Sequence, residues 1–247
     1  MTERQGRSTS RTSRLYVDTE LRPRASIELP EAAAHHAARV LRLEDGDAVV
    51  LFDGRGGEYE ARLAMPGRNR VLAATGERRD VERESPLAVT LVQAISTSDK
   101  MDFTIQKAVE LGVAAIQPVF SAKSVVRLSG EREAKKLAHW RRIAIAACEQ
   151  CGRNRIPAVA ELVALERYRA PTGSKILLSP SGAGRLADLA KGPLALAAGP
   201  EAGFSEDEEK LLARAGFVPA RLGPRVLRTE TAALAALAAL NALAGDF

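Results

Sequence analysis

The sequence predicts a two-domain α/β protein, with a small β-rich domain followed by a larger domain that has a mainly parallel sheet. Short strand patterns separated by turn residues occupy the first third of the chain, and from Leu87 onwards apolar strands alternate with helices. Two Gly/Pro loops, 199–204 and 222–228, each follow an apolar run and lead into a helix. Because ligands bind at the carboxyl ends of parallel strands, these loops predict a pocket built largely from main chain.

Composition limits the classes of protein to which the chain can belong. Its 247 residues are 46% hydrophobic and 27% charged, which suits a protein with a real core and argues against a membrane protein. The net charge of +5 weakly favours a polyanionic partner. Residues 1–14 are rich in Arg, Ser and Thr and predict a disordered basic tail, with a transit-like segment or a basic arm on RNA as alternatives.

The two cysteines, Cys148 and Cys151, form a C-E-Q-C pattern, which is typical of a redox pair or of half a zinc site. The sequence has no second Cys pair, and its three histidines are not spaced as ligands, so we expect no metal site. The flanking apolar residues follow helical spacing, which places both thiols in or beside a helix core. Such thiols are typical of a reducing compartment, and we expect a cytoplasmic protein.

The N-terminal domain is expected to span residues 15–76. Its candidate strands and turns follow one another closely: strands at 15–17, 26–29, 48–52, 59–63 and 71–73, a Gly-rich turn at 53–57, and one short helix at 30–41. Several short strands at this spacing predict a small barrel. Residues 77–86 are mostly charged and end in Pro86, which predicts a linker.

The second domain is expected to span residues 87–247. Its candidate elements alternate: strands at 87–95, 113–120, 176–178 and 194–197, and helices at 101–111, 131–151, 205–215 and from 229 onwards. Ser205 and Glu208 have the spacing of a capping box, so the helix is expected to begin there. Strands that alternate with helices predict a parallel sheet.

Several basic residues predict contacts with anions. Arg225 and Arg228 lie at a helix N-terminus, where the helix dipole disfavours a cation, so an anionic partner is expected. The loop 150–157 contains Arg153 and Arg155 and reads either as a solvated helix end or as a phosphate-binding loop. The same surface is extended in our interpretation by further basic residues: Arg14, Arg39, Arg42, Lys123 and Arg127.

One motif competes with this interpretation. Residues 182–187 fit the dinucleotide pattern G-x-G-x-x-A, with Glu201 at a suitable distance. The helix that would follow has room for little more than two turns before Gly192, and too little chain remains for a dinucleotide-binding sheet. A nucleotide-dependent oxidoreductase is therefore a third choice. The sequence has no P-loop, no G-x-S-x-G elbow and no H-E-x-x-H motif.

The two loops also resemble a known family. The run G-P-E-x-G-F-S from Gly199, followed by L-G-x-R-x-L-R-T-E-T-A from Leu222, resembles the RsmE-type methyltransferases of the SPOUT superfamily. Three further segments match in order: 100–112, 148–150 and 153–157. The resemblance covers about residues 14–243. It departs at Ala202, where the family usually has Gly, and at 181–184, which replaces a more acidic stretch.

The resemblance implies a fold and a function. The first domain would be a PUA-like RNA-binding barrel, and the second a SPOUT domain whose sheet ends in a trefoil knot. The protein would be a homodimer that binds S-adenosylmethionine and methylates N3 of a uridine in 16S ribosomal RNA, without a metal. The implied cofactor contacts are Leu178, Gly199, Pro200, Glu201, Gly203, Leu222, Gly223, Leu227, Arg228 and Thr229.

The expected roles in catalysis follow from the chemistry of methyl transfer. The N3 proton of uridine must leave, and Glu201 or Glu230 is a candidate to accept it. Arg228 is expected to stabilise negative charge on the base. RNA contacts are expected from Arg14, Arg39, Arg42, Lys123, Arg153 and Arg155. The alternative from another class of protein is a non-catalytic RNA-binding or ribosome assembly factor that keeps the fold.

Overall fold

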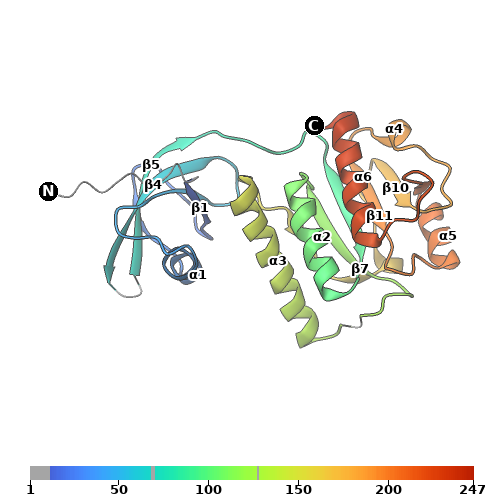
Figure 1. Cartoon of the computed structure of the whole chain (residues 1–247), viewed down its shortest axis with the longest axis horizontal. Helices are drawn as coiled ribbons and strands as arrows, with labels where there is room; N and C mark the ends of the chain where they lie inside the picture. Colours follow the sequence, from blue (N-terminus) through green and yellow to red (C-terminus); the bar gives the residue numbers. More distant parts are fainter. Residues whose placement is uncertain (1–11, 68–69, 127) are drawn as a thin grey trace. The chain divides into compact units, whose positions relative to one another are not determined.

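The computed structural model describes residues 12–67, 70–126 and 128–247. Contacts within the chain divide it into two units (Figure 1). The N-terminal unit ends at Arg83 and also includes the distant segment Gly152–Ile156, and the C-terminal unit comprises Glu84–Cys151 and Pro157–Phe247. The sequence had indicated a boundary within residues 77–86, but nothing in its local pattern indicated that 152–156 belongs with the first unit.

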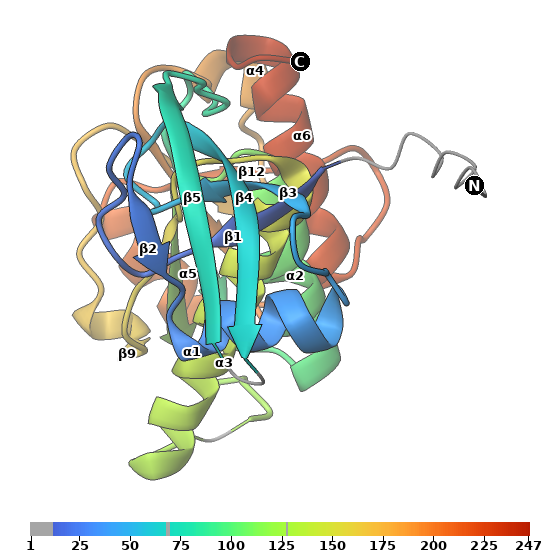
Figure 2. The ribbon, with the colours of Figure 1, turned by 90° about the vertical axis from the view of Figure 1, so that its left-hand side faces the viewer.

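The N-terminal unit is a five-stranded mixed sheet with a short helix. Its strands are β1 (Ser13–Tyr16), β2 (Ser26–Glu28), β3 (Ala48–Phe52), β4 (Glu58–Gly67) and β5 (Arg70–Arg79), in the order β1-β3-β4-β5-β2. Strand β1 is parallel to β3, and the other pairs are antiparallel. Figure 2 shows β4 and β5 as a long hairpin. Alternate strand residues such as Leu15, Leu51 and Leu63 form the core with Ala37.

The helix of this unit differs from the single helix predicted over 30–41. It consists of α1 (Glu31–His35) and a π-helical turn, η1 (His36–Val40). Leu41 N donates to His36 O, which is the i→i+5 pattern of a π-turn. The turn leaves Val40 60% exposed and is followed by Arg42 with a φ of 54°.

Two predicted boundaries in this unit are wrong. Strand β5 continues to Arg79, so the predicted linker 77–86 begins inside a strand. Strand β1 begins at Ser13, within the predicted tail 1–14, and residues 1–11 lie outside the described residues. Both errors have the same cause, because cross-strand pairing orders charged residues whose composition alone is typical of a linker or tail.

The C-terminal unit contains a parallel sheet and its connecting helices. The strands are β6 (Val89–Ala94), β7 (Ala115–Phe120), β8 (Ala158–Val159), β9 (Val163–Ala164), β10 (Ser174–Leu178), β11 (Leu194–Ala198) and β12 (Val218–Ala220). The helices are α2 (Ser98–Glu110), α3 (Glu131–Cys151), the 3-10 turn η2 (Leu165–Arg167), α4 (Leu186–Leu189), α5 (Glu206–Arg214) and α6 (Thr229–Ala244). The strand order is β12-β10-β11-β6-β7-β8, with β9 also paired to β7.

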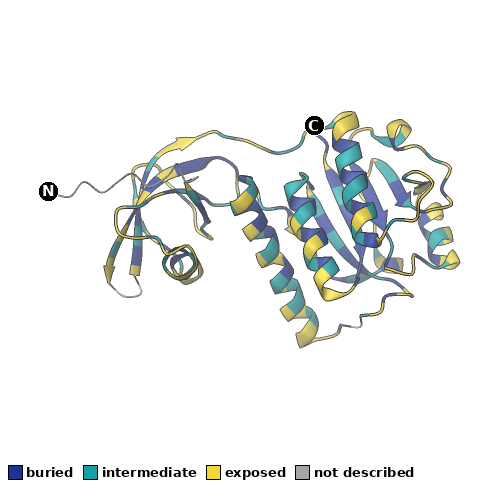
Figure 3. Ribbon diagram, viewed as in Figure 1, coloured by how far each residue is buried: buried dark blue, intermediate teal, exposed yellow. Residues whose placement is uncertain are grey.

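Helices cover both faces of this sheet. On one face, Ala195 and Ala197 of β11 belong to a buried cluster with Leu212 of α5 and Leu165 of η2. On the other face, α6 packs on β11 and β6, and α2 lies between α3 and α6 (Figure 1). Figure 3 shows the sheet strands largely buried and the outer helix faces exposed. The predicted fold class, an α/β domain with a parallel sheet preceded by a small β-rich domain, is confirmed.

The sequence located the start of α5 correctly, whereas α2 begins at Ser98 and not at the expected residue 101. The capping box is present: Ser205 Oγ accepts from Glu208 N at 3.3 Å, and Glu208 Oε2 accepts from Ser205 N at 2.8 Å.

Both cysteines lie in the last turn of α3, where Cys148 is buried and Cys151 is half-buried, and they form no disulfide. Among the described residues, no helix is both long and apolar enough to span a bilayer.

Candidate functional site

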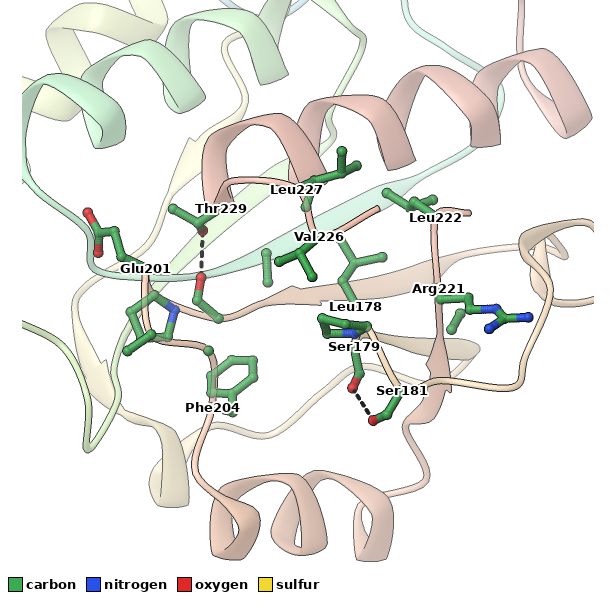
Figure 4. A pocket seen from close by; sticks show the side chains of 18 of the residues that line it. Leu178, Ser179, Ser181, Glu201, Phe204, Arg221, Leu222, Val226, Leu227 and Thr229 are labelled. Carbon is green, nitrogen blue, oxygen red and sulfur yellow. Dashed lines mark hydrogen bonds between the residues drawn. The ribbon is translucent and has the colours of Figure 1, made fainter. Parts of the chain in front are cut away.

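A cavity of about 490 Å³ lies at the carboxyl ends of β10, β11 and β12 (Figure 4). Its walls are the segment 178–181 after β10, the loop 198–204 after β11, the loop 220–227 after β12, and three helix residues, Glu209, Thr229 and Ala232. Nine of the ten predicted cofactor residues line it: Leu178, Gly199, Pro200, Glu201, Gly203, Leu222, Gly223, Leu227 and Thr229. The tenth, Arg228, does not.

Glycines give the loop after β11 its shape. A Cβ at Gly199 would lie 2.9 Å from Phe204 N, so the loop closes on itself only because residue 199 has no side chain. Gly203 has a φ of 69° and its N–H donates to Pro200 O at 2.8 Å, which closes a tight turn. Ala202 is not among the residues with positive φ. Alanine therefore causes no backbone strain at this position.

Thr229 connects the two loops and the sheet. It is the first residue of α6, and its Oγ1 donates to Gly199 O at 2.5 Å (Figure 4). The same oxygen accepts from Gln93 Nε2 of β6 at 3.1 Å. Gln93 is 1% exposed and was missed, although a glutamine in the otherwise apolar run 87–95 is a usable signal.

Glu201 lines the cavity, but its carboxylate is turned away from the other lining side chains. Its Oε1 accepts from Thr97 N at 3.1 Å and from Lys100 Nζ at 3.2 Å, and Figure 4 shows the carboxyl oxygens directed away from the other lining side chains. Burial alone would raise the pKa of Glu201, but hydrogen bonds from the Thr97 amide and from Lys100 outweigh burial and lower it. A lowered pKa makes the carboxylate a weaker proton acceptor, and its contacts with Thr97 and Lys100 fix the loop against α2. The role of Glu201 as the base stays a prediction.

The helix N-terminus beside the cavity carries the other predicted catalytic residues. Arg228 is the exposed N-cap residue of α6 and lies next to Thr229, outside the cavity lining. Glu230 is half-buried, and its Oε2 is buried without a hydrogen-bond partner among the described residues. Glu230 does not line the cavity either.

The segment after β10 brings polar groups to one wall of the cavity. Ser179 Oγ lies 3.0 Å from Ser181 Oγ and donates to Glu209 Oε1 of α5 at 3.3 Å (Figure 4). Arg221 and Arg225 also line the cavity. None of these five residues was among the predicted cofactor contacts. The contact between Ser179 and Glu209 joins residues that are 30 positions apart, so the local sequence pattern does not reveal it.

The dinucleotide-like motif has a packing role. A Cβ at Gly182 would lie 2.6 Å from Ala220 N, so Gly182 allows the chain to approach β12 closely. Gly184 N donates to Pro219 O at 2.9 Å for the same reason. The following helix, α4, has only four residues. The glycines are therefore explained by contact with β12.

Two of the predicted RNA-binding residues are buried in the N-terminal unit. Arg14 is 9% exposed and Arg153 is 4% exposed. Arg14 Nη1 donates to Glu58 Oε2 at 2.7 Å, and its Nη2 donates to Asn154 Oδ1. The guanidinium of Arg14 thus has protein partners, and the prediction of phosphate contact for Arg14 and Arg153 is corrected to a structural role.

The charge cluster formed by Arg14, Glu58, Arg83 and Asn154 holds segment 152–156 in this unit. Glu58 Oε2 also accepts from Arg83 Nη1 at 3.0 Å and from Asn154 Nδ2 at 3.2 Å. Burial alone would raise the pKa of Glu58, but hydrogen bonds from Arg14, Arg83 and Asn154 outweigh it and lower the pKa from 4.5 to about 2. Glu58 is therefore ionised at neutral pH.

The other predicted RNA-binding residues are exposed. Arg39 lies within the π-helical turn η1 and Arg42 follows it. Arg155 is exposed, and its Nε donates to Glu82 Oε2 at 2.7 Å. Lys123 Nζ donates to Phe204 O at 3.1 Å, so it supports the loop after β11. Arg127 lies outside the described residues.

Known protein families match both units of the chain. A family model described as an RNA methyltransferase domain matches residues 83–241, and one described as an RNA methyltransferase PUA domain matches residues 29–75. Curated proteins named ribosomal RNA small subunit methyltransferase E are similar over nearly all of the chain. The protein from Mycobacterium bovis is 36% identical, covering 92% of this chain and 90% of its own, and one from Buchnera aphidicola is 34% identical, covering 96% and 98%.

Two solved structures are also similar to the chain. A putative methyltransferase from Legionella pneumophila, in complex with the bound cofactor SAM, has a TM-score of 0.93 and 41% identity. A ribosomal RNA small subunit methyltransferase E from Neisseria gonorrhoeae, bound to S-adenosyl methionine, has a TM-score of 0.89 and 41% identity. Each comparison covers 96% of this chain and 100% of the other.

Proposed function

Because the chain belongs to the ribosomal RNA small subunit methyltransferase E family, we propose that it transfers the methyl group of S-adenosylmethionine to N3 of a uridine in 16S ribosomal RNA. The observation that carries the proposal is the cavity at the carboxyl ends of β10, β11 and β12, which collects nine of the ten residues expected to contact the cofactor. Two relatives that are 41% identical hold this cofactor in their structures.

The residues of the cavity fit a nucleoside ligand. Its volume of about 490 Å³ is within the usual range for small-molecule sites. The loops 199–203 and 222–227 offer main-chain amides and carbonyls, which suit the hydrogen-bonding edge of an adenine, and Leu178, Leu222 and Leu227 offer apolar contact. The bound cofactor would supply an activated methyl group on a sulfonium.

The chain's own contribution is positioning and charge. Thr229 donates to Gly199 O, and Glu201 accepts from Thr97 N. These two bonds fix the loops and keep the cavity formed before the substrate arrives. Arg228 lies at the rim on the helix N-terminus, and we assign to it the stabilisation of negative charge on the uridine carbonyl oxygens. This role places Arg228 toward the RNA and not toward the cofactor.

RNA contacts are proposed for the exposed basic residues. In the N-terminal unit, Arg39 and Arg42 are exposed and have no ion pair among the described residues, whereas Arg70 and Arg79 are paired with Glu28 and Glu60. Val40 lies between them in the sequence and is 60% exposed. Arg39 and Arg42 are therefore the proposed phosphate contacts of this unit.

The first test is calorimetric titration of S-adenosylmethionine into the purified protein, with NAD as the control ligand. Binding of S-adenosylmethionine alone supports the proposal. Small-subunit RNA is then incubated with protein and cofactor, both free and in assembled subunits, and its nucleosides are analysed for N3-methyluridine by mass spectrometry. Arg228→Ala is expected to bind the cofactor normally and to methylate slowly. A folded protein without cofactor binding would overturn the proposal and favour the non-catalytic RNA-binding alternative.

We also propose that the protein is a homodimer and that α6 contributes to the interface. Residues 232–240 are all Ala or Leu, so the helix is apolar on every side. Ala233, Ala236 and Leu237 are buried, while Leu234 and Ala238 remain partly exposed. A helix that is apolar all round is usually covered on all sides, and a second copy would provide the cover.

The oligomeric state can be measured by light scattering after size exclusion. Ala238→Glu on α6 is expected to shift the protein toward a monomer, because it places a charge on the apolar face. Ala134→Glu, at an exposed position of α3, is the matched control and is expected to leave the mass unchanged. A wild-type monomer at micromolar concentration would contradict the dimer.

A further inference from the structure

The cavity has two chemically different walls. The loops 199–203 and 222–227 contribute main chain and apolar side chains, apart from Glu201, which is held by Thr97 and Lys100, and the exposed Arg225. The segment after β10 and helix α5 contribute the polar residues Ser179, Ser181 and Glu209, and Figure 4 shows Arg221 on the same side as Ser181. Apart from Arg225, the lining ionisable groups that are free to meet a ligand are therefore Glu209 and Arg221.

Hydrogen bonding orients the groups of this polar wall. Ser179 is 4% exposed, and its hydroxyl proton is donated to Glu209 Oε1 at 3.3 Å. A serine hydroxyl has one proton, so in the contact of 3.0 Å between the two serines Ser181 is the donor and Ser179 the acceptor. The chain of donors Ser181→Ser179→Glu209 thus fixes the carboxylate at the cavity surface.

Glu209 keeps acceptor capacity for a ligand. Its Oε2 has no hydrogen bond or ion pair among the described residues, and Oε1 has only the bond from Ser179. The neighbouring carboxylate Glu208 is different, because it is buried and accepts from Ser205, Ala122 and Ser121. Of the four acidic residues in the first turn of α5, only Glu209 lines the cavity.

We propose that Glu209, oriented by Ser179 and Ser181, binds the positively charged part of the cofactor and makes the cavity selective for the charged ligand. This inference rests on the proposed function and goes beyond it by assigning a specificity-determining residue. S-adenosylmethionine has an α-ammonium and a sulfonium, both of which a carboxylate attracts. Arg221 and Arg225 line the same cavity with the opposite charge and would accommodate the α-carboxylate. Residues 181–184 replace the more acidic stretch that is common in the family, and in this chain Glu209 of α5 supplies a carboxylate beside them.

The test compares three ligands by calorimetry. S-adenosylmethionine has both positive groups, S-adenosylhomocysteine has only the α-ammonium, and methylthioadenosine has neither. Glu209→Gln is expected to weaken the binding of S-adenosylmethionine about tenfold or more, which is the usual effect of losing a hydrogen bond to a charged group. The affinity for methylthioadenosine is expected to be unchanged. If the affinity for S-adenosylhomocysteine falls by the same factor, Glu209 contacts the ammonium group. If that affinity is unchanged, Glu209 contacts the sulfonium.

Glu206→Gln is the matched control, because it removes one exposed carboxylate from the same helix turn outside the cavity. It is expected to bind all three ligands as the wild type does. The inference is overturned if Glu209→Gln binds S-adenosylmethionine like the control, or if all three ligands weaken equally, since the latter indicates a contact to the ribose or a change of the fold. A wild-type protein that binds none of the ligands would overturn the proposed function itself.

Discussion

The cavity of the C-terminal unit and the charge cluster of the N-terminal unit hold polar groups in opposite ways. The cavity is shaped by main chain, with Gly199 and Gly203 setting the turn and Thr229 tying the loops together. The cluster is made of side chains, with Glu58 accepting from three residues that are far apart in sequence. Substitutions that delete a side chain should therefore damage the cluster, whereas the cavity should be sensitive mainly to added atoms.

The largest effect is expected from Glu58→Gln. The substitution leaves Arg14 buried without a charged partner, and breaking a buried pair in this way costs about 3–5 kcal/mol of unfolding free energy. Chemical denaturation measures the change. Glu60→Gln is the control on the same strand, because its pair with Arg79 is exposed and contributes about 1 kcal/mol or less. Equal effects of the two substitutions would contradict the importance assigned to burial.

Acid should reproduce part of this effect. The pKa of Glu58 is lowered from 4.5 to about 2 in the folded protein, so its stabilisation is complete above pH 4.5 and is lost as the pH falls toward 2. The difference corresponds to about 3 kcal/mol. Denaturation midpoints measured from pH 6 to pH 2 should fall more steeply for the wild type than for Glu58→Gln. Parallel curves would show that Glu58 is not the responsible group.

The cavity is expected to respond to one added methyl group. Gly199→Ala places a Cβ 2.9 Å from Phe204 N, so the loop must shift, and binding of S-adenosylmethionine should weaken about tenfold or more, which is about 1.4 kcal/mol. Thermal denaturation should show that the protein still folds. Ala202→Gly removes a methyl group from the same exposed loop and should change affinity by about threefold at most. Unchanged affinity in Gly199→Ala would mean that the loop does not form the cofactor wall.

The smallest effect is expected for exposed charges. Arg39→Ala and Arg42→Ala should each weaken RNA binding modestly and reduce the slope of affinity against salt concentration by about one. Arg70→Ala removes the same charge from an ion pair with Glu28 and controls for net charge. If the control lowers the slope as much as the test variants do, the contact surface lies elsewhere on the N-terminal unit.

The same contrast explains which features the sequence could predict. Gly199 and Gly203 act through local backbone geometry, so the loop pattern led to residues that line the cavity. Arg14 bonds to Glu58 and to Asn154, which lies 140 residues away, and Arg153 is buried. The sequence alone could not show that these two arginines are buried. Nothing in the sequence distinguishes Glu209 from the other acids in the first turn of α5, because its contact with Ser179 depends on how α5 packs beside β10.

The interleaved segment Gly152–Ile156 has a consequence for biosynthesis. A nascent chain that has reached only Arg83 contains Arg14 and Glu58 but not Asn154, whose side chain bonds to both. The N-terminal unit therefore cannot be completed as it leaves the ribosome, although domains generally fold in order of synthesis. Its last five residues are translated after α3, so the unit that starts the chain closes only when well over half of the protein has been made.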